Sequence, residues 1–158
     1  GFEGARLEWR VAACNGGRCS RWSDPHALKW HFPSPRLVMP PPYQVGGLPL
    51  SWPVEFQVTS LPGVQHYWLC IARDAAALDA CTSPDNRSPQ NATMYARHSS
   101  NRSERLSTVP ADLRALIPAD RRMFWTMVAC GPNLEAGAFD PLECTPVMER
   151  RKVQLPPE

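Results

Sequence analysis

A short pattern occurs twice in this chain of 158 residues, once near each end. The residues Trp9-Arg10-Val11-Ala12-Ala13-Cys14 are matched by Trp125-Thr126-Met127-Val128-Ala129-Cys130, and a second cysteine follows each copy. Self-similarity at a spacing of about one domain length is typical of modular arrays. We therefore expect residues 1–33 to be the terminal hairpin of a truncated preceding module and residues 34–158 to be a complete module.

The composition favours strands over helices. The chain has 18 prolines and 9 glycines and few long stretches of good helix formers. Such a sequence is typical of many short strands joined by turns. We predict an all-β fold, with one well-buried core and an appendage, because the length is short for two domains of ordinary size.

The six cysteines fall into three near pairs: Cys14 with Cys19, Cys70 with Cys81, and Cys130 with Cys144. Six cysteines allow fifteen connectivities, so nearest-neighbour pairing is one hypothesis among several. Oxidised pairs would place the protein outside the cytosol. Buried reduced thiols are the alternative, and zinc binding is disfavoured because no Cys-x-x-Cys pair is present. The first cysteine of each pair lies on the strand phase opposite to the core, which predicts local surface disulfides.

The net charge of +2 comes from 17 basic and 15 acidic residues. This balance gives no general positive field, so we expect no nucleic-acid partner. No apolar segment approaches the ~20 residues of a spanning helix, so we expect no membrane insertion.

The first copy of the pattern reads as a hairpin. Leu7, Trp9, Val11 and Ala13 share one phase of a period-two alternation, which predicts a half-buried strand with Trp9 on its core face. Asn15-Gly16-Gly17 can supply the positive φ of a tight turn. Residues 19–23 would then return as the partner strand.

The rest of the chain predicts a sandwich of strands. After a proline-rich stretch over residues 32–53, residues 54–58 and 67–72 alternate as strands, with Tyr67 toward the core and Cys70 away from it. Residues 82–105 are polar and read mostly as loop, with a short strand at Met94 and Tyr95. Residues 108–117 predict one or two helical turns capped by Thr108. Residues 123–130 read as a central strand covered on both sides, with Trp125 in the core, and residues 143–155 as a long final strand.

Both copies of the pattern, the first continuing through Cys19-Ser20-Arg21-Trp22-Ser23, resemble the last two strands of fibronectin type III domains, especially bacterial extracellular ones. Residues 56–58, the turn 61–64 and residues 67–72 resemble the family's second and third strands, and Leu116-x-Pro118 resembles the approach to its sixth strand. The family usually has a tyrosine two residues before the sixth-strand Trp, where this chain has Leu7 and Met123. Residues 20–23 also resemble, more weakly, the Trp-Ser repeat of cytokine receptors.

The resemblance implies a fibronectin type III or immunoglobulin-like β-sandwich, preceded by an extra N-terminal hairpin. It also implies a non-catalytic binding module of a secreted, cell-surface or periplasmic protein. We expect no catalytic residues, no metal site and no cofactor, since the sequence has none of the motifs that announce a nucleophile, a phosphate loop or a zinc helix. His66 and His98 are expected on the surface.

Two groups of residues are candidates for a binding surface. Four tryptophans have weaker claims to burial and could stack on a sugar ring or a partner's apolar surface: Trp22, Trp30, Trp52 and Trp68. A basic run near the end could meet an acidic partner, although a charged strand also protects a sheet edge from aggregation: Arg150, Arg151 and Lys152. Three N-glycosylation sequons begin at Asn86, Asn91 and Asn101.

The sequence leaves three functions open. The leading hypothesis is recognition of a protein or a glycan by loops or by strand addition at a sheet edge. The alternatives are a structural spacer that positions another domain and a fragment of an enzyme whose catalytic part lies elsewhere. A strand-exchanged homodimer is a further expectation, because the apolar residues of the first hairpin need cover.

Overall fold

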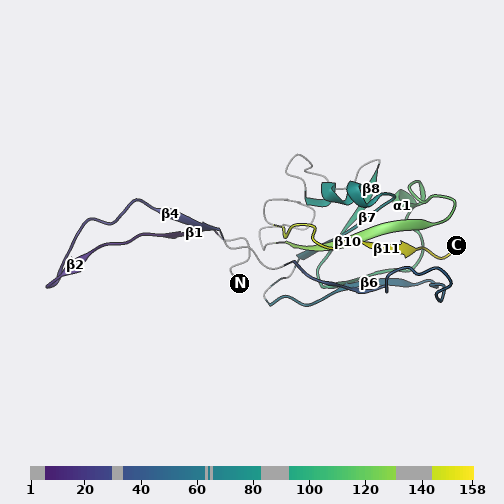
Figure 1. Cartoon of the computed structure of the whole chain (residues 1–158), viewed down its shortest axis with the longest axis horizontal. Coiled ribbons are helices and arrows are strands. Elements are labelled where there is room, and N and C mark those ends of the chain that lie inside the picture. The colour runs from purple at the N-terminus through teal and green to yellow at the C-terminus, as the bar shows by residue number, and fades with distance from the viewer. Residues whose placement is uncertain (1–5, 30–33, 63, 65, 83–92, 131–143) are drawn as a thin grey trace.

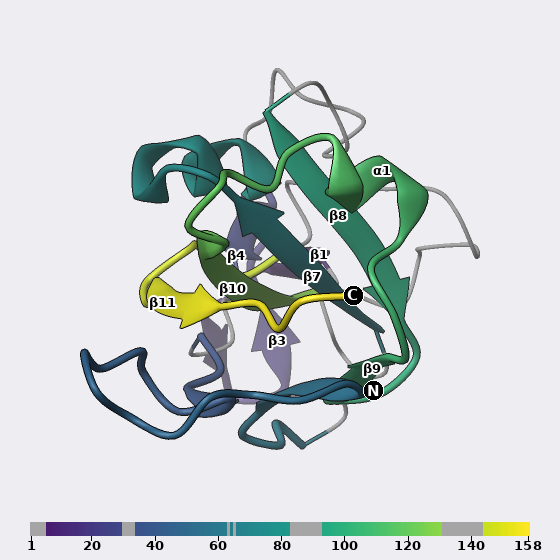
Figure 2. The same cartoon turned by 90° about the vertical axis from the view of Figure 1, so that its right-hand side faces the viewer.

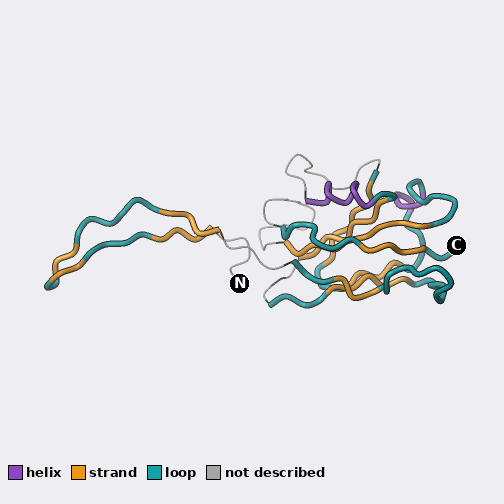
Figure 3. Tube along the Cα trace, viewed as in Figure 1, coloured by secondary structure: helices purple, strands orange, loops and turns teal. Residues whose placement is uncertain are grey.

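The computed structural model describes residues 6–29, 34–62, 64, 66–82, 93–130 and 144–158. Figure 1 shows a long β-hairpin formed by residues 6–29 and a compact body formed by the described residues from 34 onward. The regular elements are mainly antiparallel strands, and the helical segments are short (Figure 3). The predicted all-β fold class is confirmed.

The larger sheet of the body is antiparallel, with strand order β11-β10-β7-β8. Its strands are β7 (His66–Ala72), β8 (Met94–Ser99), β10 (Arg122–Cys130) and β11 (Arg151–Gln154). In β10, every residue from Trp125 to Cys130 is buried, because the strand is covered on both faces. This confirms the prediction of a central strand at residues 123–130.

The smaller sheet has strand order β5-β6-β9. It consists of β5 (Leu37–Met39), β6 (Val54–Val58) and β9 (Ser103–Leu106), and β5 pairs with β6 through a register shift. Val54, Phe56 and Val58 are buried, whereas Glu55 is exposed and Gln57 is half-buried. The predicted alternation of this strand is therefore confirmed, and it directs the apolar side chains of β6 toward the larger sheet.

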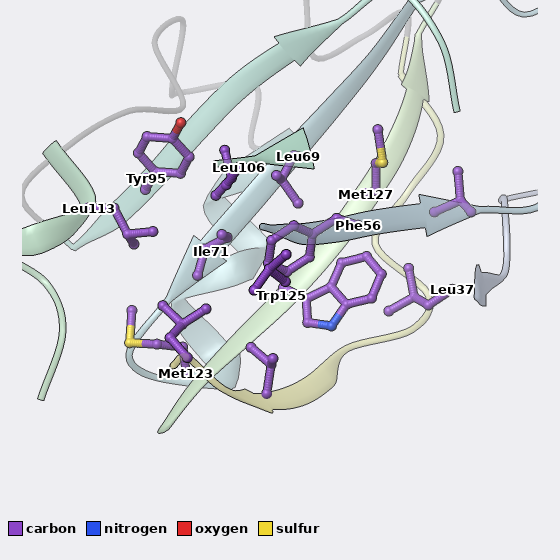
Figure 4. Close-up of a cluster of buried hydrophobic side chains, with 14 of the residues drawn as sticks. Leu37, Phe56, Leu69, Ile71, Tyr95, Leu106, Leu113, Met123, Trp125 and Met127 are labelled. Atoms are coloured by element: carbon purple, nitrogen blue, oxygen red, sulfur yellow. The ribbon is translucent and has the colours of Figure 1, made fainter. Parts of the chain in front are cut away.

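The main core lies between the two sheets, which form two layers in Figure 2. The ring of Phe56 from β6 meets Trp125 from β10 edge to face, with centroids 5.1 Å apart (Figure 4). Tyr67, Leu69 and Ile71 of β7 face the same core, as the sequence predicts. The body is thus a β-sandwich whose two sheets share one apolar interior.

A second, smaller core lies on the opposite face of the larger sheet. The 3-10 helix η1 (Ala75–Thr82) covers this face and brings Leu78 and Cys81 onto Trp68, Cys70 and Val128. Cys70 does point away from the main core, but Cys70 and Cys81 are fully buried, so the prediction of exposed surface disulfides is wrong here. The period-two pattern reports which face a residue occupies and does not report whether another element covers that face.

The prediction of a mostly loop segment over residues 82–105 is also wrong in its second half. Residues 94–106 form the β8 and β9 strands, joined by a tight turn in which the Ser99 hydroxyl donates to the carbonyl oxygens of Asn101 (2.9 Å) and Ser103 (3.2 Å). The two strands belong to different sheets. Six of the ten residues of these strands are polar, among them Arg97 and Glu104, which form an ion pair, and the buried Ser99, so the sequence shows no clear apolar alternation.

The end of the chain differs from prediction in two places. The final strand β11 is limited to Arg151–Gln154, and before it only an isolated bridge joins Cys144 to Cys130. The predicted helical turn is present as α1 (Ala111–Arg114), but it begins after Pro110 without a side-chain cap bond, so Thr108 is not its cap. Leu113 of α1 is buried in the main core.

The hairpin of residues 6–29 extends away from the body in Figure 1. β1 (Arg6–Trp9) pairs with β4 (His26–Lys29), and β2 (Cys14–Asn15) pairs with β3 (Arg18–Cys19) at the tip. Gly16 and Gly17 make the turn with φ of +54° and +83°, a conformation that glycine adopts without steric cost. The predicted hairpin and its turn are confirmed.

Candidate interaction surfaces

The tryptophans predicted as a binding surface do not lie together. Trp68 is only 8% exposed and belongs to the second core, which contradicts its assignment to the surface. Trp52 packs against the main core, and its indole N–H donates to the carbonyl oxygen of Pro157 at 2.9 Å. Trp22 is 68% exposed on the hairpin, and Trp30 lies outside the described residues. Of the candidates within the described ranges, only Trp22 is available to a partner.

The basic run at the end of the chain is divided between structural roles. Arg150 forms an ion pair with Asp79 of η1. Arg151 points the other way, as strand alternation predicts, and donates to the carbonyl oxygens of Leu37, Val38 and Pro40 at 2.7 to 3.1 Å, which fixes β5 to the end of the chain. The ammonium group of Lys152 lies 5.2 Å from the centre of the Phe124 ring. These three residues therefore do not form a free basic patch.

The disulfides link Cys14 to Cys19, Cys70 to Cys81 and Cys130 to Cys144, which are the nearest-neighbour pairs of the sequence. Two of them join directly opposed residues of antiparallel segments, with Cα atoms 4.0 Å apart for Cys14 and Cys19 and 3.9 Å apart for Cys130 and Cys144. Three disulfides indicate an oxidising compartment outside the cytosol.

The two copies of the sequence pattern make the same local structure. The amide of Ala13 donates to the Ser20 hydroxyl (3.0 Å), and the amide of Ser20 donates to the Ala13 carbonyl (2.7 Å). In the second copy, Ala129 and Thr145 form the same two bonds, at 3.1 Å and 2.7 Å. The position one residue before each of these hydroxyls is a disulfide cysteine. The hairpin of residues 6–29 is thus a structural repeat of β10 and residues 144–154.

The repeats differ in what covers them. Trp125 and Met127 of β10 are 0% and 1% exposed, because the β5-β6-β9 sheet packs on them. The equivalent residues, Trp9 and Val11, are 49% and 57% exposed, and the ring of Trp9 stacks only on His26 in the described part of the chain, with centroids 4.8 Å apart. The prediction that Trp9 belongs to a core is wrong within this chain. We call the side of the hairpin that carries Trp9 and Val11 the uncovered face.

A second surface was not foreseen from the sequence. A cavity of about 560 Å³ lies between the proline-rich segment 41–50 and the end of the chain around Val153 and Leu155. Val45 and Leu48 in this segment are 87% and 97% exposed. The only sequence signal is a pair of apolar residues flanking Gly46-Gly47, and such isolated residues are common in loops.

Two histidines that the sequence predicts on the surface lie in contact. His66 Nδ1 and His98 Nε2 are 3.0 Å apart, and the His98 ring also meets Trp68 edge to face. Partial burial lowers the pKa of His98 from its ordinary value of 6.5, and the neighbouring His66 lowers it further, while Glu104 opposes the shift. His98 lies in strand β8 and not in a loop, so its predicted location is corrected.

Burial also raises the pKa of the Tyr95 phenol, and Arg97 opposes this shift. Its neighbour Arg97 has a raised pKa, chiefly through the hydrogen bond to Tyr95. Both groups therefore keep their protons at neutral pH.

Asn101 is the one predicted glycosylation residue within the described ranges. It is exposed in the turn between β8 and β9, where its side-chain oxygen accepts a bond from the Ser103 amide at 2.8 Å. Asn86 and Asn91 lie outside the described residues.

The described residues contain no group of three or more His, Cys, Asp or Glu residues placed to hold a metal ion. Within the same ranges, no helix has the length and apolar character needed to cross a bilayer. Comparisons with protein-family models, curated proteins and solved structures find no match to this chain.

Proposed function

We propose that this chain is a non-catalytic, fibronectin type III-like binding module of an extracellular, cell-surface or periplasmic protein, and that it binds another protein through the hairpin of residues 6–29. The observation that carries the proposal is the contrast between Trp125, which is 0% exposed, and Trp9, which is 49% exposed at the equivalent position.

The strand order supports the family assignment. Counted from β5, the first, second and fifth strands form one sheet, and the fourth, third, sixth and seventh form the other. This is the arrangement expected of a seven-stranded sandwich in which the fourth strand has joined the sheet of the third. The family motifs of the sequence fall on its second, third, sixth and seventh strands.

The hairpin has the two features that strand addition requires. Its uncovered face presents Trp9 and Val11, which in the second copy are matched by fully covered residues. In addition, β1 pairs only with β4 among the described residues, whereas its equivalent β10 also pairs with β7. A partner strand can therefore add to the free edge of β1 by main-chain hydrogen bonds while its sheet covers Trp9.

A glycan is the weaker partner. Stacking on a sugar needs a platform of exposed aromatic rings. Of the four predicted tryptophans, Trp68 is buried and Trp52 packs on the main core, so they supply no such platform. In the second copy of the repeat, apolar side chains of the opposing sheet cover the residues equivalent to Trp9 and Val11, so a protein surface suits the uncovered face better than a sugar.

The spacer function is the second candidate, and the repeat itself favours it. If the uncovered face is completed by other strands of the same polypeptide, the hairpin and the body are parts of consecutive modules. Self-association through the uncovered face is a third arrangement, and sedimentation velocity at rising concentration tests it. Trp9→Ser would abolish a concentration-dependent dimer. Trp22→Ser would not, because Trp22 aligns with Val147, which packs on the second core and not on the sheet that covers Trp125.

Photo-crosslinking from single positions tests the proposal. A photoreactive amino acid is placed at Val11 on the uncovered face or, as a control, at the exposed Ser107 of the body, in the organism that makes the chain. We expect a discrete adduct with another protein from position 11 and none from position 107. Adducts confined to the same polypeptide, or equal adducts from both positions, would refute the binding function.

A further inference from the structure

The contact between His66 and His98 is a pair of nitrogen ligands held by the sheet. The two ring centroids are 5.2 Å apart with an interplanar angle of 34°, and His66 Nδ1 faces His98 Nε2 at 3.0 Å. Both side chains are half-buried, so solvent still reaches them. The function proposed above uses neither residue.

The backbone places the two rings without help from a loop. His98 is the cross-strand partner of Trp68, and His66 lies two residues before Trp68 on the same face of β7. Diagonal neighbours of this kind are within reach of each other when their side chains are long or aromatic. The ladder between β7 and β8 is continuous from Tyr67 to Ala72, and Ser99 binds the turn that follows β8, so the spacing is set by paired strands.

We propose that His66 and His98 form a binding site for one divalent transition-metal ion of the Cu²⁺, Ni²⁺ and Zn²⁺ class, with His66 Nδ1 and His98 Nε2 as the protein ligands and water in the remaining positions. Imidazole nitrogen is a preferred ligand of these ions.

The observed spacing is close to what one metal ion needs. Two nitrogens at about 2.0–2.1 Å from an ion with tetrahedral angles lie about 3.3 Å apart. The present separation of 3.0 Å is that of a hydrogen bond between the two rings. Metal binding therefore displaces the shared proton and turns the two half-buried rings until both lone pairs point at the ion, a few tenths of an ångström farther apart. The site is pre-arranged by the fold and needs no movement of the strands.

The chemistry of the site follows from its ligand number. The described residues bring no third His, Cys, Asp or Glu to this pair, so coordination positions stay open to water or to a group from a partner molecule. With only two imidazole ligands, affinity follows the intrinsic order of the ions, and Cu²⁺ should bind more tightly than Ni²⁺ or Zn²⁺. A bound ion would also join β7 to β8, the outermost described strand of its sheet.

Calorimetric titration of the disulfide-intact chain, without a polyhistidine tag, tests the site with NiCl₂ and with CuCl₂. We expect one ion per chain, and at least ~10-fold weaker binding in His66→Asn and in His98→Asn, since even loss of an outer-shell group costs that much. His26→Asn is the matched control, because His26 also contacts a tryptophan ring but has no second histidine beside it in the described chain. It should bind like the parent chain.

A second readout separates binding from misfolding. The rings of His98 and Trp68 have centroids 5.7 Å apart, so Cu²⁺ at the site should quench the fluorescence of Trp68 and raise the thermal midpoint by mass action. Each Asn variant is first checked for a metal-free midpoint close to that of the parent chain. Asn variants that fold and still bind as tightly, or a parent chain that gives no binding and no quenching at millimolar metal, would overturn the site without affecting the proposed function.

Discussion

Trp9 and Trp125 occupy equivalent positions in the two repeats, but their surroundings give them very different contributions to stability. Trp125 is buried against Phe56, whereas Trp9 is half exposed. We predict that Trp125→Ala lowers the free energy of unfolding by about 3–5 kcal/mol, as expected for a large core side chain. Trp9→Ala should change it by no more than about 0.5 kcal/mol. Urea unfolding followed by circular dichroism measures both, and equal losses would show that Trp9 is covered in solution.

Arg150 and Arg151 are adjacent in sequence and make a second matched pair. Arg151 bonds three carbonyl oxygens around β5, so Arg151→Met should cost about 1–3 kcal/mol by leaving those acceptors without a charged donor. Among the described residues, Arg150 pairs with Asp79 at the surface, so Arg150→Met should cost less than about 1 kcal/mol. The same denaturation experiment decides, and a larger loss for Arg150 would contradict these roles.

His98 predicts how stability depends on pH in a metal-free buffer with chelator. Its pKa is lower in the folded protein than the ordinary 6.5. Between these two values the unfolded chain binds more protons, so stability rises with pH and is lost as the pH falls below 6.5 through the folded pKa. Urea midpoints measured from pH 5 to pH 8 should rise in the parent chain and rise less in His98→Asn. A parent chain whose stability is constant over this range would show that the pKa of His98 is not lowered on folding.

At the scale of elements, the disulfides should differ in their effect on the body. Cys70–Cys81 holds η1 on the second core, and replacing both residues with Ala should lower the free energy of unfolding by about 2–4 kcal/mol. The same double replacement of Cys14 and Cys19 should leave the unfolding of the body unchanged within about 0.5 kcal/mol, because that disulfide lies at the tip of the separate hairpin. Comparable losses in the two variants would mean that the hairpin and the body unfold together.

The sequence predicts those elements whose apolar pattern is local. Alternation in residues 54–58 and 67–72 predicts both the strands and the faces of Phe56 and Tyr67. The sequence does not predict most of β8 and β9, because their exposed residues are polar and their pairing partners lie far along the chain. The cover that η1 gives to Cys70 and the meeting of His66 with His98 are tertiary contacts, and no local pattern carries them.

In the whole molecule, the same hairpin structure occurs twice, in different surroundings. In the body, the second copy is enclosed by five further strands, two in its own sheet and three in the opposing one. In residues 6–29, the same pattern of opposed cysteines and hydroxyl bonds leaves an apolar face and a strand edge without cover among the described residues. This difference in cover between the two copies is the basis for proposing that the hairpin binds a partner and that the sandwich supports it.

Hydrogen–deuterium exchange, read by mass spectrometry on the dilute, disulfide-intact chain, measures whether the two repeats differ in cover. Amides of β7 and β10 should exchange only by unfolding of the whole body, since they lie in paired strands buried on both faces. Amides of β1 and β4 should exchange orders of magnitude faster, because an isolated two-stranded hairpin is marginally stable in water. Equal protection of β1 and β10 would contradict the account, because it would mean that the face carrying Trp9 is already enclosed within this chain.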